Sequence, residues 1–360
     1  MTIRVPLREQ RDASYDILIG PGLLAELPAL LKRHCPAAAY AVITDSHVAK
    51  LYGEAVVATL PAQLFSFPAG EWNKTRETWA SLSDRMLAAH FGRDCAVIAL
   101  GGGVVGDVAG FLAATYLRGV PYVQVPTSLL AMIDSSIGGK TGVDVPAGKN
   151  LLGAFHQPRL VAADLNLLAS LPPVQLSAGL AEAVKHGVIA DAEYFTFLER
   201  DYAAIVAKHA AALERVVRRS VEIKAAVVAE DEREAGRRAI LNFGHTIGHA
   251  IEATAKYEAL HGEAVAIGMV YEARLAEALG VAGAGTAERI MRLLERFRLP
   301  LERPDGASAN DLIEAMRGDK KVRGGAIRFA LPTGVGAMHR DAQHGWTVAV
   351  PEERIAKVLS

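Results

Sequence analysis

The stretch that decides the fold reads CAVIALGGGVVGDVAGF and spans residues 95–111. Its first part, from Cys95 to Leu100, has the length and the apolar composition of a buried strand. Three glycines follow, and Gly101, Gly103 and Gly106 satisfy the pattern G-x-G-x-x-G. We expect a helix over residues 104–116. Because glycine carries no side chain, the N–H groups at the start of that helix can approach a bound anion closely.

This glycine pattern alone has two interpretations. It fits a dinucleotide-binding turn, and it also fits a glycine-rich turn between a strand and a helix that binds nothing. The usual dinucleotide fingerprint has an acidic residue about 20 residues further on. At that distance residues 125–127 read VPT, so this is not the ordinary first unit of a Rossmann domain.

A polar, glycine-rich segment follows. Residues 134–144 read DSSIGGKTGVD, and Gly148, Lys149 and Asn150 come shortly after them. We expect a loop that binds phosphate, because a segment dense in Gly, Ser and Lys suits that ligand. A plain solvated loop is the alternative, but Leu151 and Phe155 make the segment too apolar for one.

Length and composition limit the class of protein. The chain has 360 residues, 51% of them hydrophobic, which predicts two domains or one large domain with a sizeable core. A net charge of −1 argues against nucleic acid as the main partner. Two cysteines give no disulfide framework. The charged N-terminus is unlike a signal peptide, and no apolar run reaches membrane-spanning length. These features predict a soluble, cytoplasmic protein without a membrane partner.

Strand and helix patterns divide the chain near Leu171-Pro172-Pro173. Up to Asp164 they alternate, which predicts a parallel sheet covered by helices. From Gln175 to Met316 nearly every segment has helical periodicity. A small hairpin is expected over 327–338. We therefore predict an α/β domain over 1–172 and a mostly α-helical domain over 173–360.

Histidine and glutamate side chains in the helical half form a candidate metal site. Glu182, His245, His249 and His261 lie in three stretches of this half, and one carboxylate with two imidazoles would leave a coordination position open, as a catalytic zinc site requires. His245 and His249 are four residues apart and project from one helical face, so spacing alone makes them the natural pair. His186 follows Glu182 by four residues and is a further competitor.

Eight motifs together carry a family resemblance. They read GGGVVGDVAGF, LRG, VPTSLLAMIDSSIGGKTGVD, GKNLLGAFHQP, LPPVQLSAGLAEAVKHG, LNFGHTIGHAIE, HGEAVAIGM and DKK, and they extend over nearly the whole chain. The joint pattern resembles the 3-dehydroquinate synthase family of the sugar-phosphate cyclase superfamily. That resemblance implies a Rossmann-like NAD-binding domain followed by an α-helical domain for metal and substrate. Met132 and Ser170 depart from the glutamine and threonine that are common in the family, which puts individual cofactor contacts in doubt.

The resemblance also implies roles for individual residues. One Zn²⁺ or Co²⁺ falls on Glu182, His245 and His261, and His249 becomes a substrate or proton-transfer residue. The implied catalytic and substrate-binding residues are Arg118, Asp134, Lys140, Asn150, Lys185, Lys224, Glu234, Arg238, Asn242, His249 and Lys320. The implied cofactor-binding residues are Asp45, Glu71, Lys74, Gly101, Gly102, Gly103, Gly106, Asp107, Thr127, Ser128, Asp134, Lys140, Lys149 and Ser170.

Two of the cofactor assignments have structural alternatives. Asp45 ends a predicted strand over 40–44, where an acid can bind a ribose hydroxyl or cap the next helix. Glu71 and Lys74 open a helix predicted to run to His90, where they can equally be first-turn charges on a surface helix.

The activity implied by the resemblance is an NAD- and metal-dependent phosphorus–oxygen lyase. Its substrate is 3-deoxy-D-arabino-heptulosonate 7-phosphate, its products are 3-dehydroquinate and phosphate, and the expected assembly is a homodimer. Transient oxidation, phosphate elimination, re-reduction and aldol closure make up the reaction. The alternatives are another sugar-phosphate cyclase, a metal-dependent polyol dehydrogenase that releases NADH, and a non-catalytic sugar-phosphate sensor.

Overall fold

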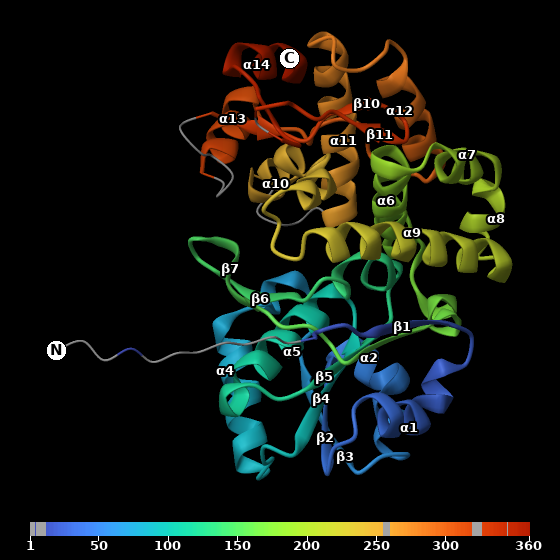
Figure 1. Ribbon diagram of the computed structural model, residues 1–360, viewed down its shortest axis with the longest axis vertical. Coiled ribbons are helices and arrows are strands. Elements are labelled where there is room, and N and C mark those ends of the chain that lie inside the picture. The colour runs from blue at the N-terminus through green and yellow to red at the C-terminus, as the bar shows by residue number, and fades with distance from the viewer. Residues whose placement is uncertain (1–3, 5–11, 255–259, 319–325, 344) are drawn as a thin grey trace.

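A six-stranded parallel sheet forms the N-terminal half of the computed structural model (Figure 1). The structure describes residue 4 and residues 12–254, 260–318, 326–343 and 345–360. The strand order is β1-β8-β5-β4-β2-β3. The strands are β1 (Asp16–Gly20), β2 (Ala39–Asp45), β3 (Ala62–Phe67), β4 (Cys95–Gly101), β5 (Tyr122–Pro126) and β8 (Leu160–Asp164).

Helices cover both faces of this sheet, as the alternation of patterns predicted. On one face, alternate residues such as Ile43 and Val97 pack against α4 (Arg76–Ala88) and α5 (Gly103–Thr115). On the other face, neighbours such as Val42 and Ile98 pack against α1 (Leu23–His34) and α3 (Glu54–Val57). The helical segments of this half are α1 (Leu23–His34), α2 (Ser46–Val48), η1 (Ala49–Gly53), α3 (Glu54–Val57), η2 (Glu71–Asn73), α4 (Arg76–Ala88), α5 (Gly103–Thr115), η3 (Tyr116–Arg118), η4 (Ala131–Ser135) and η5 (Leu165–Ser170). Cys35 and Cys95 are both unpaired and buried.

The glycine-rich turn lies at the point where the order of the strands along the sheet reverses. From β2 the chain continues outward to β3, and from β4 it continues through α5 to β5 on the other side. The carboxyl ends of β2 and β4 therefore flank a topological switch point, where open α/β sheets bind ligands. Asp45 ends one strand and Gly101 ends the other.

The second half is mostly helical and lies above the carboxyl edge of the sheet (Figure 1). Its helical segments are α6 (Pro173–Ala190), α7 (Ala192–Arg200), α8 (Tyr202–Val206), α9 (Ala210–Glu230), η6 (Arg237–Asn242), α10 (His245–Thr254), α11 (His261–Ala278), α12 (Thr286–Arg296), α13 (Ala309–Arg317) and α14 (Glu352–Leu359). Short strands accompany them: β9 (Arg328–Phe329), β10 (Pro332–Gly334), β11 (Ala337–Met338) and β12 (Val348–Ala349).

The predicted hairpin over 327–338 is only partly present. β10 pairs with β11 as expected, but β9 pairs with the later strand β12. α6 begins at Pro173, and the boundary between residues 172 and 173 stays a prediction. Across the residues described, no helix combines the length and the apolar character needed to cross a bilayer.

The expected phosphate-binding loop is instead a two-stranded antiparallel hairpin. β6 (Lys140–Val145) pairs with β7 (Gly148–Phe155), and the hairpin lies between the two halves (Figure 1). The prediction of a loop was wrong from Lys140 onward, whereas residues 136–139 are turn and loop. Hydrogen bonds between β6 and β7 stabilise the hairpin. β6 also packs closely on α5, since a Cβ on Gly110 would lie 2.3 Å from Cγ2 of Thr141.

Candidate active site

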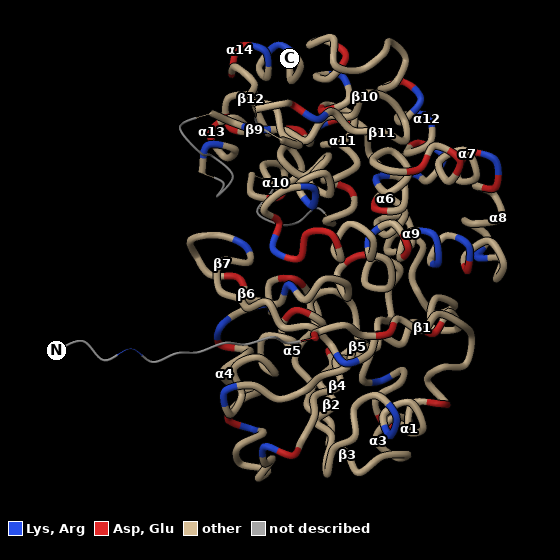
Figure 2. Tube along the Cα trace, in the orientation of Figure 1, with Lys and Arg blue, Asp and Glu red and all other residues tan. Residues whose placement is uncertain are grey.

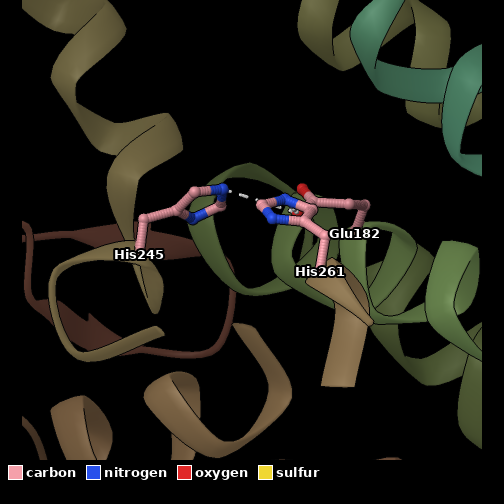
Figure 3. Close-up of side chains that lie close together, drawn as sticks. All are labelled: Glu182, His245 and His261. Carbon is pink, nitrogen blue, oxygen red and sulfur yellow. Dashed lines mark ion pairs between the residues drawn. The ribbon is translucent and has the colours of Figure 1, made fainter. Parts of the chain in front are cut away.

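The three predicted metal ligands come from three helices and point toward one another (Figure 3). Glu182 lies on α6, His245 is the first residue of α10, and His261 is the first residue of α11. Oε1 of Glu182 is 3.6 Å from Nε2 of His245 and 3.4 Å from Nε2 of His261. One ligand atom from each residue lies within 4.8 Å of the others. Their side chains therefore converge on one point, as ligands of a single metal ion must.

The chemistry of this donor set fits a divalent cation. Glu182 is fully buried; its Oε2 pairs with the Lys185 ammonium, and its Oε1 faces His245 and His261. Burial alone would raise the pKa of Glu182, but the nearby Lys185 ammonium holds it well below its usual range, so the carboxylate is charged. A buried, charged carboxylate facing two imidazoles is stabilised when a cation joins them.

Close helix packing determines the separation of these ligands. A Cβ on Gly262, next to His261, would lie 2.0 Å from the carbonyl oxygen of Ala178 on α6. A Cβ on Gly268 would lie 1.9 Å from the carbonyl oxygen of Gly244, which precedes His245. Only glycine allows α11 to approach both neighbours at these points. The sequence HGEAVAIGM therefore carries a ligand and the two small residues that place it.

The N-terminus of α10, which positions His245, is held by a carboxylate from α11. Glu272 is fully buried and accepts hydrogen bonds from the backbone N–H groups of Gly244 (2.7 Å) and Ile247 (3.1 Å). A negative charge at this end of a helix is favourable because the helix dipole is positive there. Burial and Lys185 keep the pKa of His245 well below its usual value, so its imidazole is neutral and available to a metal.

His261 lies between two buried carboxylates. Its Nδ1 is 3.4 Å from Oε1 of Glu252, and its Nε2 faces Glu182. Burial alone would lower the pKa of His261, but the hydrogen bonds to Glu182 and Glu252 raise it to about 10. Since a metal binds the unprotonated nitrogen, metal binding at this site releases a proton.

The two competing histidines lie beside the three predicted ligands. The ring of His249 is 5.3 Å from that of His245 and 6.3 Å from that of His261, and His249 groups with Glu252 and His261. His186 groups with Asp134 and Glu182. A cation is disfavoured there, because the ammonium groups of two lysines already face Asp134.

Those two lysines and Asp134 form a second charged cluster. Oδ1 of Asp134 is 2.7 Å from Nζ of Lys224 on α9 and 3.8 Å from Nζ of Lys185 on α6. Burial lowers the pKa of Lys224 to about 8. The pKa of Asp134 is well below its usual range, because the two lysines outweigh the effect of burial. The structure therefore brings these three predicted substrate residues together.

A third cluster joins the hairpin to the helical half. Lys140 at the start of β6 pairs with Glu234, whose other oxygen accepts a 2.5 Å hydrogen bond from Nδ2 of Asn242. Arg238 is buried nearby and donates to the carbonyl oxygen of Gly138. Figure 2 shows acidic and basic positions along this junction between the sheet and the helices.

Lys74 and Lys149 face the same junction, contrary to part of the sequence interpretation. The helix begins at Arg76, where Thr75 caps it, so Glu71 and Lys74 precede it and are not in its first turn. Lys74 is buried, with Nζ 2.5 Å from Oδ2 of Asp107 and 2.6 Å from Oδ1 of Asn150. It is therefore no surface charge.

The predicted cofactor residues line the switch point of the sheet. Oδ1 of Asp45 caps α2 by accepting hydrogen bonds from the N–H groups of residues 47 and 48, so the capping interpretation is correct. A Cβ on Gly106 would lie 2.9 Å from Oε1 of Gln124 on β5, which is the close helix–strand packing expected of the third glycine in the fingerprint. The remaining members border the same edge: Gly101, Gly102 and Gly103 in the turn, Thr127 and Ser128 after β5, and Ser170 at the end of η5.

Arg118 is not brought to this junction. Arg118 follows α5 at the opposite edge of the sheet, about 20 Å of helix away from the glycine-rich turn. Its implied role as a catalytic or substrate-binding residue stays a prediction. Lys320 lies outside the described residues.

Sequence reasoning missed Glu252 and Glu272. A signal for Glu252 is present, since it follows His245 by seven residues and His249 by three, on the same helical face.

Comparison with known proteins agrees with this geometry. The 3-dehydroquinate synthase N-terminal family matches residues 64–178, and the 3-dehydroquinate synthase C-terminal family matches residues 179–322. A relative from Symbiobacterium thermophilum named 3-dehydroquinate synthase is 53% identical over 331 residues, covering 90% of this chain and 92% of the relative.

Two solved structures of sugar-phosphate cyclases are similar throughout. The 2-epi-5-epi-valiolone synthase ValA from Streptomyces hygroscopicus, with NAD⁺ and Zn²⁺ bound, has a TM-score of 0.89 and 32% identity, covering 99% of this chain and 98% of that one. A 2-deoxy-scyllo-inosose synthase, complexed with carbaglucose-6-phosphate, NAD⁺ and Co²⁺, has a TM-score of 0.87 and 30% identity, covering 96% of each chain. The fold expected from the sequence is confirmed, and the chain belongs to the 3-dehydroquinate synthase family.

Proposed function

We propose that this chain converts 3-deoxy-D-arabino-heptulosonate 7-phosphate to 3-dehydroquinate and phosphate, with NAD and one divalent metal ion. The convergence of Glu182, His245 and His261 beside three clusters of lysine–carboxylate pairs carries the proposal. The match of the family over both halves and the 53% identity to a 3-dehydroquinate synthase support it.

The two bound groups supply the redox chemistry. Glu182, His245 and His261 would hold the metal, which would supply a Lewis acid for the oxygen at C5, and the glycine-rich turn after β4 would hold NAD, which would supply a reversible hydride acceptor.

The chain's own residues bind and orient the sugar acid. Lys140 is the natural partner for the phosphate, because its side chain is 50% exposed while its carboxylate partner Glu234 is 22% exposed. An arriving phosphate can therefore exchange with Glu234 as the partner of Lys140 without breaking a buried ion pair. Asn150 lies in β7 of the same hairpin, and the family resemblance makes it a substrate contact as well.

The buried cations suit the carboxylate and hydroxyl groups of the substrate. Lys224 and Arg238 are both buried and lie beside Asp134 and Gly138 respectively. Water is largely excluded here, so hydrogen bonds to charged groups are stronger than in solvent. His249 adjoins both histidine ligands, which is a suitable place for a residue that moves a proton.

Three finer assignments belong to this proposal. Zn²⁺ and Co²⁺ are both compatible with one carboxylate and two imidazoles. We also propose a cytoplasmic homodimer, in which Arg118 of one subunit serves the site of the other. The boundary near residue 172 would then separate a nucleotide domain from a metal and substrate domain that close on binding.

An assay that follows phosphate, product and NADH together tests the activity and distinguishes it from the alternatives. The purified protein is incubated with substrate, Zn²⁺ or Co²⁺ and a catalytic amount of NAD, and phosphate, product and NADH absorbance are followed together. We expect one phosphate for each product and no NADH accumulation in the steady state. NADH formed in step with product without phosphate release would refute the synthase and favour a polyol dehydrogenase.

Lys140→Ala provides the matched variant for this assay. Loss of a charge-assisted contact to phosphate should lower kcat/KM by about 10- to 150-fold, which corresponds to about 1.5–3 kcal/mol. The metal content should stay unchanged because Lys140 is not in the ligand set. An unchanged kcat/KM would show that the phosphate binds elsewhere.

A further inference from the structure

Glu252 is a buried carboxylate at the centre of the site with no role assigned above. It lies on α10 and is 2% exposed. Its Oε1 is 3.4 Å from Nδ1 of His261 and 2.9 Å from Nζ of Lys149. Lys149 comes from β7, so this carboxylate joins a predicted metal ligand to the hairpin that the N-terminal half contributes.

The two histidine ligands are held in the same way at the nitrogen that faces away from Glu182. Nδ1 of His245 lies 3.1 Å from the carbonyl oxygen of Phe243. A carbonyl oxygen can only accept, so Nδ1 of His245 carries the proton and Nε2 is free to bind a metal. At His261 the same position is filled by Glu252, again with Nε2 directed at Glu182.

A carboxylate behind a metal-binding imidazole has a known physical effect. By accepting the Nδ1 proton it fixes the tautomer and the ring orientation, and it increases the basicity of the nitrogen that binds the metal. An unpaired carboxylate at this depth would be strongly unfavourable. The Lys149 ammonium offsets that cost, and Lys149 is itself 3.4 Å from Oε1 of Glu71.

We propose that Glu252 is a positioning residue of the metal centre, which orients His261 and links it through Lys149 to the β6–β7 hairpin. This inference rests on the proposed metal site and deepens it. Glu252 touches a ligand and not the reacting atoms, so its effect is on metal affinity and not on a chemical step of its own.

Direct coordination by Glu252 is the competing role. His249, Glu252 and His261 also bring ligand atoms within 4.8 Å of one another. The Lys149 ammonium lies 2.9 Å from Oε1 of Glu252, and this charge disfavours a cation bound to the same oxygen. Nε2 of His261 also points to Glu182, away from this second group.

Zn²⁺ affinity of the full-length chain tests the role without any measurement of activity. Metal-free protein is titrated with Zn²⁺ against a chromophoric chelator, for the wild type, Glu252→Ala, Glu252→Gln and His261→Ala. We expect the wild type to bind one Zn²⁺ and His261→Ala to lose it. Glu252→Ala should weaken Zn²⁺ binding by about 10- to 100-fold. Glu252→Gln should recover much of that loss, because its amide oxygen still accepts the Nδ1 proton.

Two controls separate positioning from general damage and from coordination. Glu199→Ala removes a carboxylate that pairs with Arg289 in the helical half away from the site, and it should leave Zn²⁺ affinity unchanged. The visible spectrum of Co²⁺-saturated Glu252→Ala should match that of the wild type, because the ligand set is intact. Adding Lys149→Met to Glu252→Ala should not weaken Zn²⁺ binding further, since the two residues act through one contact.

Each remaining outcome is decisive. Wild-type Zn²⁺ affinity in folded Glu252→Ala would overturn the positioning role while leaving the proposed function intact. A changed Co²⁺ spectrum would overturn it in favour of direct coordination. Absence of Zn²⁺ binding in the wild type would instead overturn the proposed function, and this inference with it.

Discussion

Replacing Gly262 by alanine should separate a metal ligand from its partners. The new Cβ would lie 2.0 Å from the carbonyl oxygen of Ala178 and 2.5 Å from its carbonyl carbon and Cα, all of which are backbone atoms of α6 that cannot rotate away. An ordinary contact begins at 3.4 Å, so α11 must move by about 1.4 Å relative to α6. Metal–ligand distances tolerate only about 0.2 Å.

The predicted magnitude follows from this displacement. His261 is adjacent to the substituted residue and Glu182 lies on the opposing helix, so the shift acts directly on their separation. We expect Zn²⁺ affinity to fall by about 100-fold or more, beyond the range for loss of an outer contact. Overpacking should also lower the free energy of unfolding by about 1–3 kcal/mol. Alanine is intrinsically better than glycine in a helix by about 1 kcal/mol, so any loss arises from the clash.

The assay is Zn²⁺ titration together with urea unfolding, and Gly283→Ala is the matched control. A Cβ on Gly283, just beyond the end of α11, would meet nothing within 4 Å. The control should therefore keep wild-type metal affinity. If folded Gly262→Ala also bound Zn²⁺ as the wild type does, the idea that helix contact distance determines the ligand geometry would be wrong.

Three further predictions concern other parts of the site. Gly103→Val should abolish NAD binding measured by calorimetry. A Cβ there would lie 3.1 Å from Oγ of Ser135, and the branched side chain would occupy the space through which the pyrophosphate approaches the backbone. Unchanged NAD affinity would place the cofactor elsewhere. Burial lowers the pKa of Lys224 to about 8 from 10.5, so between these values the unfolded chain holds more protons and stability rises with pH. From about pH 7.5 to 9.5 the wild type should gain roughly 2 kcal/mol of unfolding free energy over Lys224→Met, and equal slopes would contradict this. Glu272→Ala should lower the unfolding free energy by about 2–5 kcal/mol in urea titrations, since it leaves the N–H groups of Gly244 and Ile247 buried without their carboxylate; a loss below 1 kcal/mol would argue against this role.

Local patterns predicted much of the fold and less of the site. The β4 strand and its glycine turn were predictable because an apolar run followed by G-x-G-x-x-G depends on neighbouring residues alone. The start of α4 was misplaced because the acidic and basic residues of GEWNK suggested a first turn. Thr75, whose hydroxyl accepts from the N–H of Thr78, was the cap signal that could have corrected it.

Long-range contacts account for what the sequence alone did not provide. Lys140 and Lys149 lie in a hairpin whose composition suggested a loop, and only pairing between β6 and β7 makes it a sheet. Spacing favoured His249 as the partner of His245, whereas Nε2 of both His245 and His261 faces Glu182. Helix packing brings these atoms together, and the role of the glycines that permit this packing becomes visible only when the neighbouring helix is known.

The β6–β7 hairpin has a consequence for recombination between relatives. Along the chain it belongs to the N-terminal half, yet its two lysines pair with Glu234 and Glu252 of the helical half. A chimera joined near residue 172 would combine a hairpin from one parent with acidic partners from another. Crossovers on either side of residues 138–155, which transfer the hairpin together with the helical half, should therefore preserve specificity better than exchange of either half as a block.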